Sequence, residues 1–192
     1  MILVGVLALQ GDFAEHIKVL NLMKINALEV KNKKDLDKCS ALIIPGGEST
    51  AIGKLLAISG LGKEIKKRVS KGMPFYGTCA GAIVAAKKVI NEKEFTPLGL
   101  IDVVIERNAY GRQTESFEAE VNIKNEKING VFIRAPVIKK IGKGVEILAK
   151  FEKNPVLVKQ GRVIIGSFHP ETEGKTIVHK LLISLIKNQE NN

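Results

Sequence analysis

The chain has 192 residues, of which 45% are hydrophobic, and its formal net charge is +10 at pH 7. This length and apolar content are typical of one compact domain with a full core, so we expect a single domain over residues 1–192. Only 5% of the residues are aromatic, and the lysines are spread along the chain. This pattern argues against nucleic acid as a partner, because base stacking needs aromatic side chains on a basic surface.

The first predicted element is the apolar run at residues 2–9, which is typical of a buried strand. It is too short to span a bilayer, and no basic residues precede it, so we expect neither a signal peptide nor a membrane segment. The two cysteines, Cys39 and Cys79, occur without a secretory signal. The sequence therefore predicts a cytoplasmic protein in which Cys39 is inert packing.

Short apolar runs alternate with amphipathic stretches in the first half of the chain. Predicted strands are residues 2–9, 27–30, 41–45, 74–78, 100–106, 118–123, 130–133, 145–151, 156–160 and 163–168, and predicted helices are residues 13–25, 50–59, 61–71, 80–89 and 176–187. Strands rich in Val, Ile and Leu that alternate with helices form parallel sheets covered on both faces. We therefore expect an α/β, three-layer, flavodoxin-like fold with a mostly parallel central sheet.

The most informative motif is Gly77-Thr78-Cys79-Ala80-Gly81, between a predicted strand and a predicted helix. Flanking glycines permit the sharp turn of a nucleophile elbow, which would present the cysteine at its tip. The unpaired N–H groups and positive dipole at a helix start stabilise a thiolate, the nucleophilic form of cysteine. The motif therefore predicts Cys79 as a catalytic nucleophile.

A nucleophilic cysteine also needs a base and a group that orients the base. His169-Pro170-Glu171 supplies both residue types. Pro170 favours an extended conformation at His169, and side chains two apart in an extended segment point the same way. We therefore expect the Glu171 carboxylate to hold one imidazole nitrogen of His169 and to complete a triad with Cys79.

Two further loops are expected at the carboxyl ends of the strands, where ligands bind in such sheets. In the loop at residues 45–50, the Gly47 N–H is a candidate for the oxyanion hole, together with the N–H of Ala80. The glycine pair is not followed by Gly-Lys-Ser/Thr, which excludes a phosphate loop. We find no clustered Cys/His spacing and predict neither a metal nor a cofactor. Arg107 and Arg134 lie in polar clusters, and either could bind substrate or pin its own loop.

The elbow and the His169-Pro170-Glu171 motif resemble the class I (triad) glutamine amidotransferases. Stretches at residues 8–12, 45–50, 107–113 and 132–136 narrow the resemblance to glutaminase subunits of pyridoxal 5'-phosphate synthase. The resemblance implies that Cys79 is the nucleophile, His169 the base and acid, and Glu171 its orienting partner. The positions that match the family's glutamine-binding residues are Gly46, Gly47, Glu48, Ser49, Arg107, Ile133 and Arg134, and Gln10 matches a position near the oxyanion hole.

The activity implied by this resemblance is hydrolysis of L-glutamine to glutamate and ammonia through a cysteine thioester. A separate synthase subunit would bind and activate the glutaminase in a hetero-oligomer and use the ammonia to build pyridoxal 5'-phosphate. Two alternatives are another α/β cysteine hydrolase, peptidase-like or deglycase-like, and a non-enzymatic binding subunit. His16 and His179 are expected on solvated helix faces.

Overall fold

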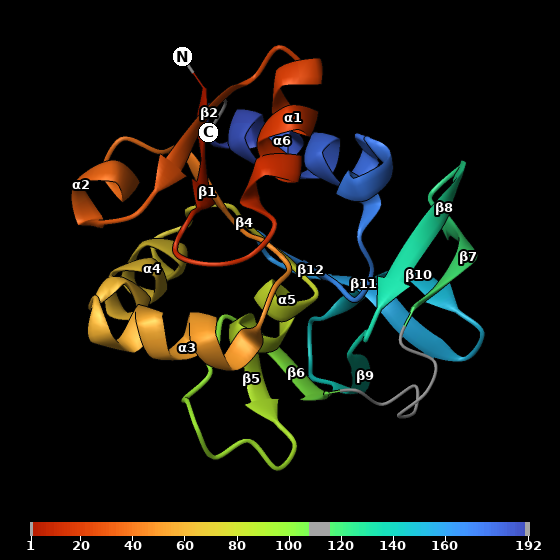
Figure 1. Cartoon of the computed structure of the whole chain (residues 1–192). Helices are drawn as coiled ribbons and strands as arrows, with labels where there is room; N and C mark the ends of the chain where they lie inside the picture. The colour runs from red at the N-terminus through yellow and green to blue at the C-terminus, as the bar shows by residue number, and fades with distance from the viewer. Residues whose placement is uncertain (1, 108–115, 191–192) are drawn as a thin grey trace.

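The structure is a computed structural model that describes residues 2–107 and 116–190. Its centre is a seven-stranded sheet with the order β10-β11-β12-β4-β3-β1-β2 (Figure 1). These strands are β1 (Leu3–Leu7), β2 (Asn26–Val30), β3 (Ala41–Ile44), β4 (Phe75–Thr78), β10 (Glu146–Phe151), β11 (Asn154–Gln160) and β12 (Val163–Gly166). The five strands from β12 to β2 are parallel, whereas β10 and β11 are antiparallel. The parallel part has the strand order of flavodoxin, which confirms the predicted fold class.

Helices cover both faces of this sheet and produce three layers (Figure 1). One face carries α1 (Phe13–Leu22) and α6 (Ile177–Glu190), and the other carries α3 (Ser49–Ile58), α4 (Leu61–Ser70) and α5 (Ala80–Ala85). Side chains alternate along each strand. In β3, Leu42 and Ile44 therefore pack under α3 and α4, whereas Ala41 and Ile43 join the core under α1 and α6. Every strand residue of β3 is buried, which explains its unbroken apolar run.

Smaller sheets extend this core. The three-stranded sheet contains β5 (Ala86–Val89), β6 (Ile101–Glu106) and β9 (Val137–Ile141), and the hairpin of β7 (Ser116–Ile123) and β8 (Glu126–Ile133) packs beside β10. The predicted helix at residues 80–89 is wrong beyond Ala85, because the chain turns there and pairs with β6 as β5. Neither β9 nor the short helix α2 (Lys33–Leu36) was predicted. Both are short and rich in lysine, so hydrophobic periodicity does not detect them.

The edge of the sheet that carries the candidate site is defined by the pairing of β4 with β12. These strands are parallel, and Gly166 lies opposite Thr78. The residues that follow each strand therefore leave the sheet side by side, although they are far apart in the sequence. Within the described ranges, no helix combines the length and apolar character needed to cross a membrane.

Candidate active site

Cys79 lies in the turn between β4 and α5, as the elbow motif predicts. Its backbone is left-handed, with φ of 50°, a conformation that is costly for a residue with a side chain and is often found at active sites. Its N–H donates to the carbonyl oxygen of Gly166 at 2.8 Å. A Cβ atom at Gly81 would lie 2.0 Å from the carbonyl oxygen of Ile44. The elbow therefore needs glycine because α5 packs directly onto the strand backbone.

His169 and Glu171 follow β12 and contact each other as predicted, but in a different backbone conformation. His169 Nδ1 lies 2.8 Å from Glu171 Oε1, and both side chains are buried. The extended segment expected here is wrong beyond His169, because Pro170–Glu173 forms a 3-10 helix, η1. Proline is well suited to the first helical position, and Gly174 ends the turn with φ of 65°.

The environment of His169 favours its protonated form. Burial lowers the pKa of His169, but its interactions with Cys79 and Glu171 outweigh burial and raise the pKa to about 10. The imidazole is therefore protonated at neutral pH, and its positive charge faces Cys79 on one side and a carboxylate on the other. This arrangement is typical of a cysteine nucleophile paired with an acid-base histidine.

A cavity of about 360 Å³ opens at Cys79 and His169. Its other lining residues are Gln10, Asp12, Gly47, Glu48, Ser49, Ile83, Arg107, Ile133 and Arg134. Three predicted site residues do not line it. Glu171 lies behind His169, and Ala80 begins α5 next to Cys79. Gly46 packs on the imidazole of His169 so closely that a Cβ atom added to Gly46 would lie 2.3 Å from Cε1 of the ring.

Sequence reasoning missed two residues of this cavity, Asp12 and Ile83. Asp12 precedes α1 at the carboxyl end of β1, so the rule that ligands bind at strand ends could have included it. Ile83 lies one helical turn after Cys79, and its N–H donates to the carbonyl oxygen of Cys79 at 3.0 Å. Helical spacing from the nucleophile could have identified this residue.

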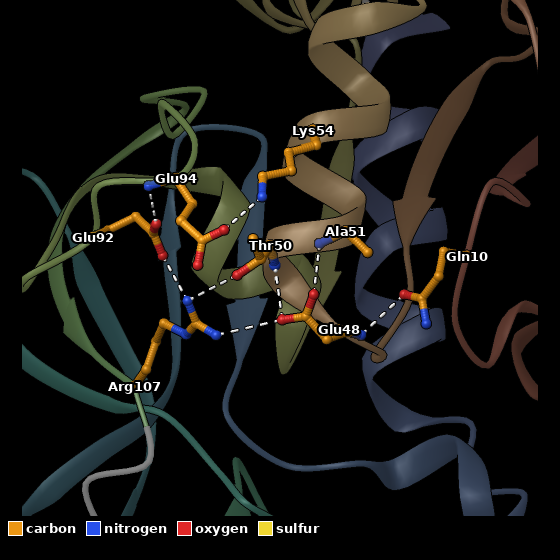
Figure 2. Close-up of polar contacts among 8 residues, drawn as sticks. All are labelled: Gln10, Glu48, Thr50, Ala51, Lys54, Glu92, Glu94 and Arg107. Atoms are coloured by element: carbon orange, nitrogen blue, oxygen red, sulfur yellow. Dashed lines mark hydrogen bonds and ion pairs between the residues drawn. The ribbon is translucent and has the colours of Figure 1, made fainter.

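The loops after β1 and β3 are locked together beside the nucleophile. Gln10 Oε1 accepts the N–H of Glu48 at 2.9 Å (Figure 2), and the N–H of Asp12 donates to the carbonyl oxygen of Gly46 at 3.0 Å. Gly47 has φ of 150°, and a Cβ atom there would lie 2.5 Å from Gln10 Oε1. Glycine is therefore required by both the conformation and the contact, and the peptide between Gly46 and Gly47 has a fixed orientation.

Glu48 caps α3 and also meets an arginine (Figure 2). Its carboxylate accepts the N–H groups of Thr50 at 3.0 Å and Ala51 at 2.6 Å, and it lies 3.4 Å from Arg107 Nη2. Burial raises the pKa of Glu48, but these hydrogen bonds and Arg107 outweigh burial and lower it overall. An ionised carboxylate is stabilised at this position by the helix N-terminus.

Arg107 is held by more than Glu48. Its Nη1 lies 2.6 Å from Glu92 Oε2 and 3.1 Å from Thr50 Oγ1 (Figure 2). Arg107 is thus pinned by two acids while it lines the cavity. The two roles left open for this residue, binding substrate and fixing its loop, are compatible. The remaining residues of the predicted motif, 108–113, lie outside the described part of the chain.

Comparison with known proteins agrees with this geometry. Residues 6–188 match the SNO glutamine amidotransferase family. The chain belongs to this family. It is 48% identical over 184 residues to pyridoxal 5'-phosphate synthase subunit PdxT of Thermus thermophilus, covering 95% of this chain and 96% of the relative. It is 46% identical to the PdxT subunit of Pseudothermotoga lettingae, covering 95% and 94% of the two chains.

A solved structure of high identity supports the assignment to the glutamine amidotransferases, and a more distant one shares the fold. A crystal structure of a glutamine amidotransferase superposes with a TM-score of 0.92 at 48% identity, covering 96% of this chain and 98% of the other. The structure of PurLQS from Thermotoga maritima matches with a TM-score of 0.70 at 17% identity, covering 95% and 97%, which indicates a shared fold alone. The enzyme is thus a glutamine amidotransferase with the α/β fold of its family.

The expectation that His16 and His179 lie on solvated helix faces is wrong. Both side chains are fully buried, and His16 Nδ1 lies 3.0 Å from His179 Nε2. His16 falls at helical spacing from Phe13 and Leu20, so its place on the buried face of α1 could have been read from the periodicity. Cys39 behaves as predicted: it is half-buried, its thiol donates to a backbone carbonyl, and burial raises its pKa to about 11.

Acidification from pH 6.5 to pH 4 is expected to reduce the free energy of unfolding through His179. Burial lowers the pKa of His179 from 6.5 to about 4, whereas the unfolded chain takes up this proton near the ordinary pKa. Neutral His179 therefore contributes about 3 kcal/mol to the free energy of unfolding. This contribution is complete above pH 6.5 and is lost as the pH falls to 4. Urea unfolding across this range measures the slope. His179→Gln is expected to flatten it, and equal slopes for both proteins would contradict the prediction.

Proposed function

We propose that this chain hydrolyses L-glutamine to L-glutamate and ammonia and delivers the ammonia to a pyridoxal 5'-phosphate synthase subunit. The proposal includes a cytoplasmic location and one glutaminase domain over residues 1–192. One observation carries the chemistry: Cys79 and His169, which is held by Glu171, line one cavity with the charged pair Glu48 and Arg107. A substrate with an α-carboxylate and an α-ammonium suits a cavity that presents both charges.

In the first step, the Cys79 thiolate attacks the side-chain amide carbon of glutamine. The backbone N–H groups of Gly47 and Ala80 are proposed to stabilise the oxyanion, with Gln10 holding the loop that carries Gly47. His169 donates its proton to the leaving nitrogen, so that ammonia departs and a glutamyl thioester remains. A neutral amide nitrogen would otherwise leave as an anion, which is far less favourable.

In the second step, water hydrolyses the thioester. The now neutral His169 takes a proton from water, the hydroxide attacks the thioester carbon, and the C–S bond breaks to release glutamate. The proton returns the imidazole to its charged form beside the thiolate. Glu171 keeps Nδ1–H oriented in both steps, since its carboxylate accepts from that nitrogen at 2.8 Å. The remaining substrate contacts are assigned to Gly46, Ser49, Ile133 and Arg134.

The decisive experiment is a glutamate-release assay on the chain alone and after co-purification with the candidate synthase. Water would protonate free ammonia and remove it as a nucleophile. Coupling the hydrolysis of glutamine to a bound synthase avoids this loss. We expect the synthase to bind and to raise the rate. Equal rates with and without it would contradict the proposed coupling. Hydrolysis of a dipeptide panel in place of glutamine would instead favour another cysteine hydrolase.

Turnover of glutamine is expected to fall as the pH rises through about 10. The pKa of His169 is raised to about 10, and above this pH the resting enzyme loses the proton that the departing nitrogen requires. The imidazolium is present below this pKa and absent above it, so the decline is on the alkaline side. The pH dependence of kcat/KM, which reports the pKa values of the free enzyme, measures this decline. A decline centred near pH 6.5, the ordinary histidine pKa, would contradict this prediction.

A further inference from the structure

A buried polar cluster lies directly beneath the catalytic residues. It contains His16 of α1, Tyr76 of β4, Glu171 of η1 and His179 of α6, all at 1% exposure or less. Glu171 Oε1 lies between two imidazoles: His169 Nδ1 is 2.8 Å away, and His16 Nε2 is 3.5 Å away. His16 Nδ1 in turn meets His179 Nε2 at 3.0 Å. These contacts extend the site from the cavity to the opposite helix layer.

Both histidines of this cluster are neutral. Burial lowers the pKa of His179 to about 4, and burial, followed by the proximity of His179 and His169, lowers the pKa of His16 well below its ordinary value. The ring of Tyr76 packs edge-on against both imidazoles, with centroids 5.8 Å and 5.7 Å away. Glu171 therefore faces one positive charge, on His169. A second charged imidazole would compete with His169 for the carboxylate.

A neutral imidazole has one N–H and one bare nitrogen, and the contacts of His16 select between the two arrangements. If Nδ1 carried the proton, the lone pair of Nε2 would face the negative carboxylate of Glu171, which is repulsive. With the proton on Nε2, the positive end of the N–H dipole lies near Glu171 Oε1, at a nitrogen–oxygen distance of 3.5 Å that is favourable electrostatically without being a hydrogen bond. Its bare Nδ1 can then accept only if His179 carries its proton on Nε2. The carboxylate thus determines the tautomers of both rings.

We propose that His16 and His179 are positioning residues of the glutaminase, in which two successive Nε2–H groups hold the Glu171 carboxylate against His169. This inference rests on the proposed function for its kinetic consequence only. Both imidazoles contact Oε1 of Glu171, whereas Oε2 makes no hydrogen bond to the described residues, so the carboxylate is held at one oxygen. His16 places a neutral N–H dipole beside Oε1, so it favours the position of the carboxylate electrostatically and leaves the full negative charge of Glu171 for His169.

The first test is a spectroscopic measurement on the wild-type chain, and it does not require glutamine hydrolysis. The chain has 3 histidines, so nitrogen-15 NMR of the imidazoles contains few signals, which His16→Gln and His179→Gln assign. We expect His16 and His179 to be neutral Nε2–H tautomers and His169 to carry protons on both nitrogens. A proton on Nδ1 of His16 would overturn the proposal even if the enzyme is fully active.

The second test compares His16→Leu with His16→Gln in the glutamate-release assay, with the synthase present. Leucine removes the N–H, whereas a glutamine amide can place one near the position of Nε2. We expect kcat to fall about tenfold in His16→Leu and to recover in His16→Gln. The KM for glutamine is expected to stay unchanged in both, because His16 does not line the cavity. Equal kcat values for the two variants would overturn the proposal.

Val19→Ala is the matched control, since Val19 is buried on the same helix and lies outside the cavity. It is expected to lower the free energy of unfolding without changing kcat. If it lowers kcat as much as His16→Leu does, the effect is general loosening of α1 and the proposal fails. A wild-type protein that does not hydrolyse glutamine at all would contradict the proposed function, while the tautomers would still decide the hydrogen-bond arrangement.

Discussion

Cys79→Ala is expected to abolish glutamine hydrolysis and to leave the fold and synthase binding intact. Without the sulfur no thioester forms, and loss of the nucleophile in comparable hydrolases costs about 10⁶-fold in kcat. The substitution is structurally mild, because alanine keeps the Cβ atom and has a similar steric cost at the φ of 50° that Cys79 adopts. The glutamate-release assay measures the loss, and thermal unfolding checks the fold. Turnover at the wild-type rate would end the proposed mechanism.

Cys39→Ala is the control for this experiment. Cys39 is the other cysteine of the chain, and its thiol donates to the carbonyl oxygen of Asp35 at 3.2 Å, outside the cavity. We expect Cys39→Ala to retain the glutamate-release activity of the wild-type protein. A glutamine analogue that alkylates thiols should label Cys79 rapidly in this variant, and equally slow labelling of both cysteines in the wild-type protein would favour a non-enzymatic binding role.

Glu171→Gln is expected to reduce kcat by about 10³- to 10⁴-fold without unfolding the protein, by analogy with the loss of the orienting acid in a serine protease triad. The amide has the same shape but no charge, so the imidazolium of His169 loses its partner across 2.8 Å. Because Glu171 contributes to the raised pKa of His169, we also expect the alkaline decline in kcat/KM to move to lower pH. Steady-state kinetics across pH measures both effects.

Glu173→Gln separates Glu171 from the other acid of the same turn. The structure directs Glu173 away from the imidazole, since its Oε1 accepts from Asn129 Nδ2 at 2.9 Å. We therefore expect Glu173→Gln to keep nearly full activity. An unchanged rate in Glu171→Gln together with a large loss in Glu173→Gln would show that Glu173 orients His169.

The turn at Cys79 and the contact between His169 and Glu171 could be predicted because local chain properties favour them. The glycines around Cys79 indicate the elbow, and Pro170 between His169 and Glu171 brings a base and an acid within one turn. Strands β3 and β4 were also predictable, because both are buried on both faces and follow or contain short apolar runs in the sequence. These features depend on backbone preferences of a few consecutive residues, so the sequence itself carries them.

Other parts of the site depend on contacts between distant segments. The pinning of Arg107 by Glu48 and Glu92 joins three loops, and the strand conformation of residues 86–89 exists because β6 pairs with it. Neither pattern is visible in any one segment. The extended conformation expected from His169 to Glu171 was also wrong beyond His169, since the preference before proline says nothing about the residues after it.

The sequence alone indicates the alternation of apolar strands with helices, the elbow around Cys79 and the acid beside His169. These features follow from steric limits on the backbone angles of neighbouring residues, which do not depend on tertiary contacts. The periodicity of α1 indicates that His16 is buried, but the tertiary structure alone brings His16 and His179 together next to Glu171. A histidine has the same local preferences on a solvated face and in a core. Its burial, charge and tautomer are set by the strands, helices and carboxylate that other parts of the chain bring to it.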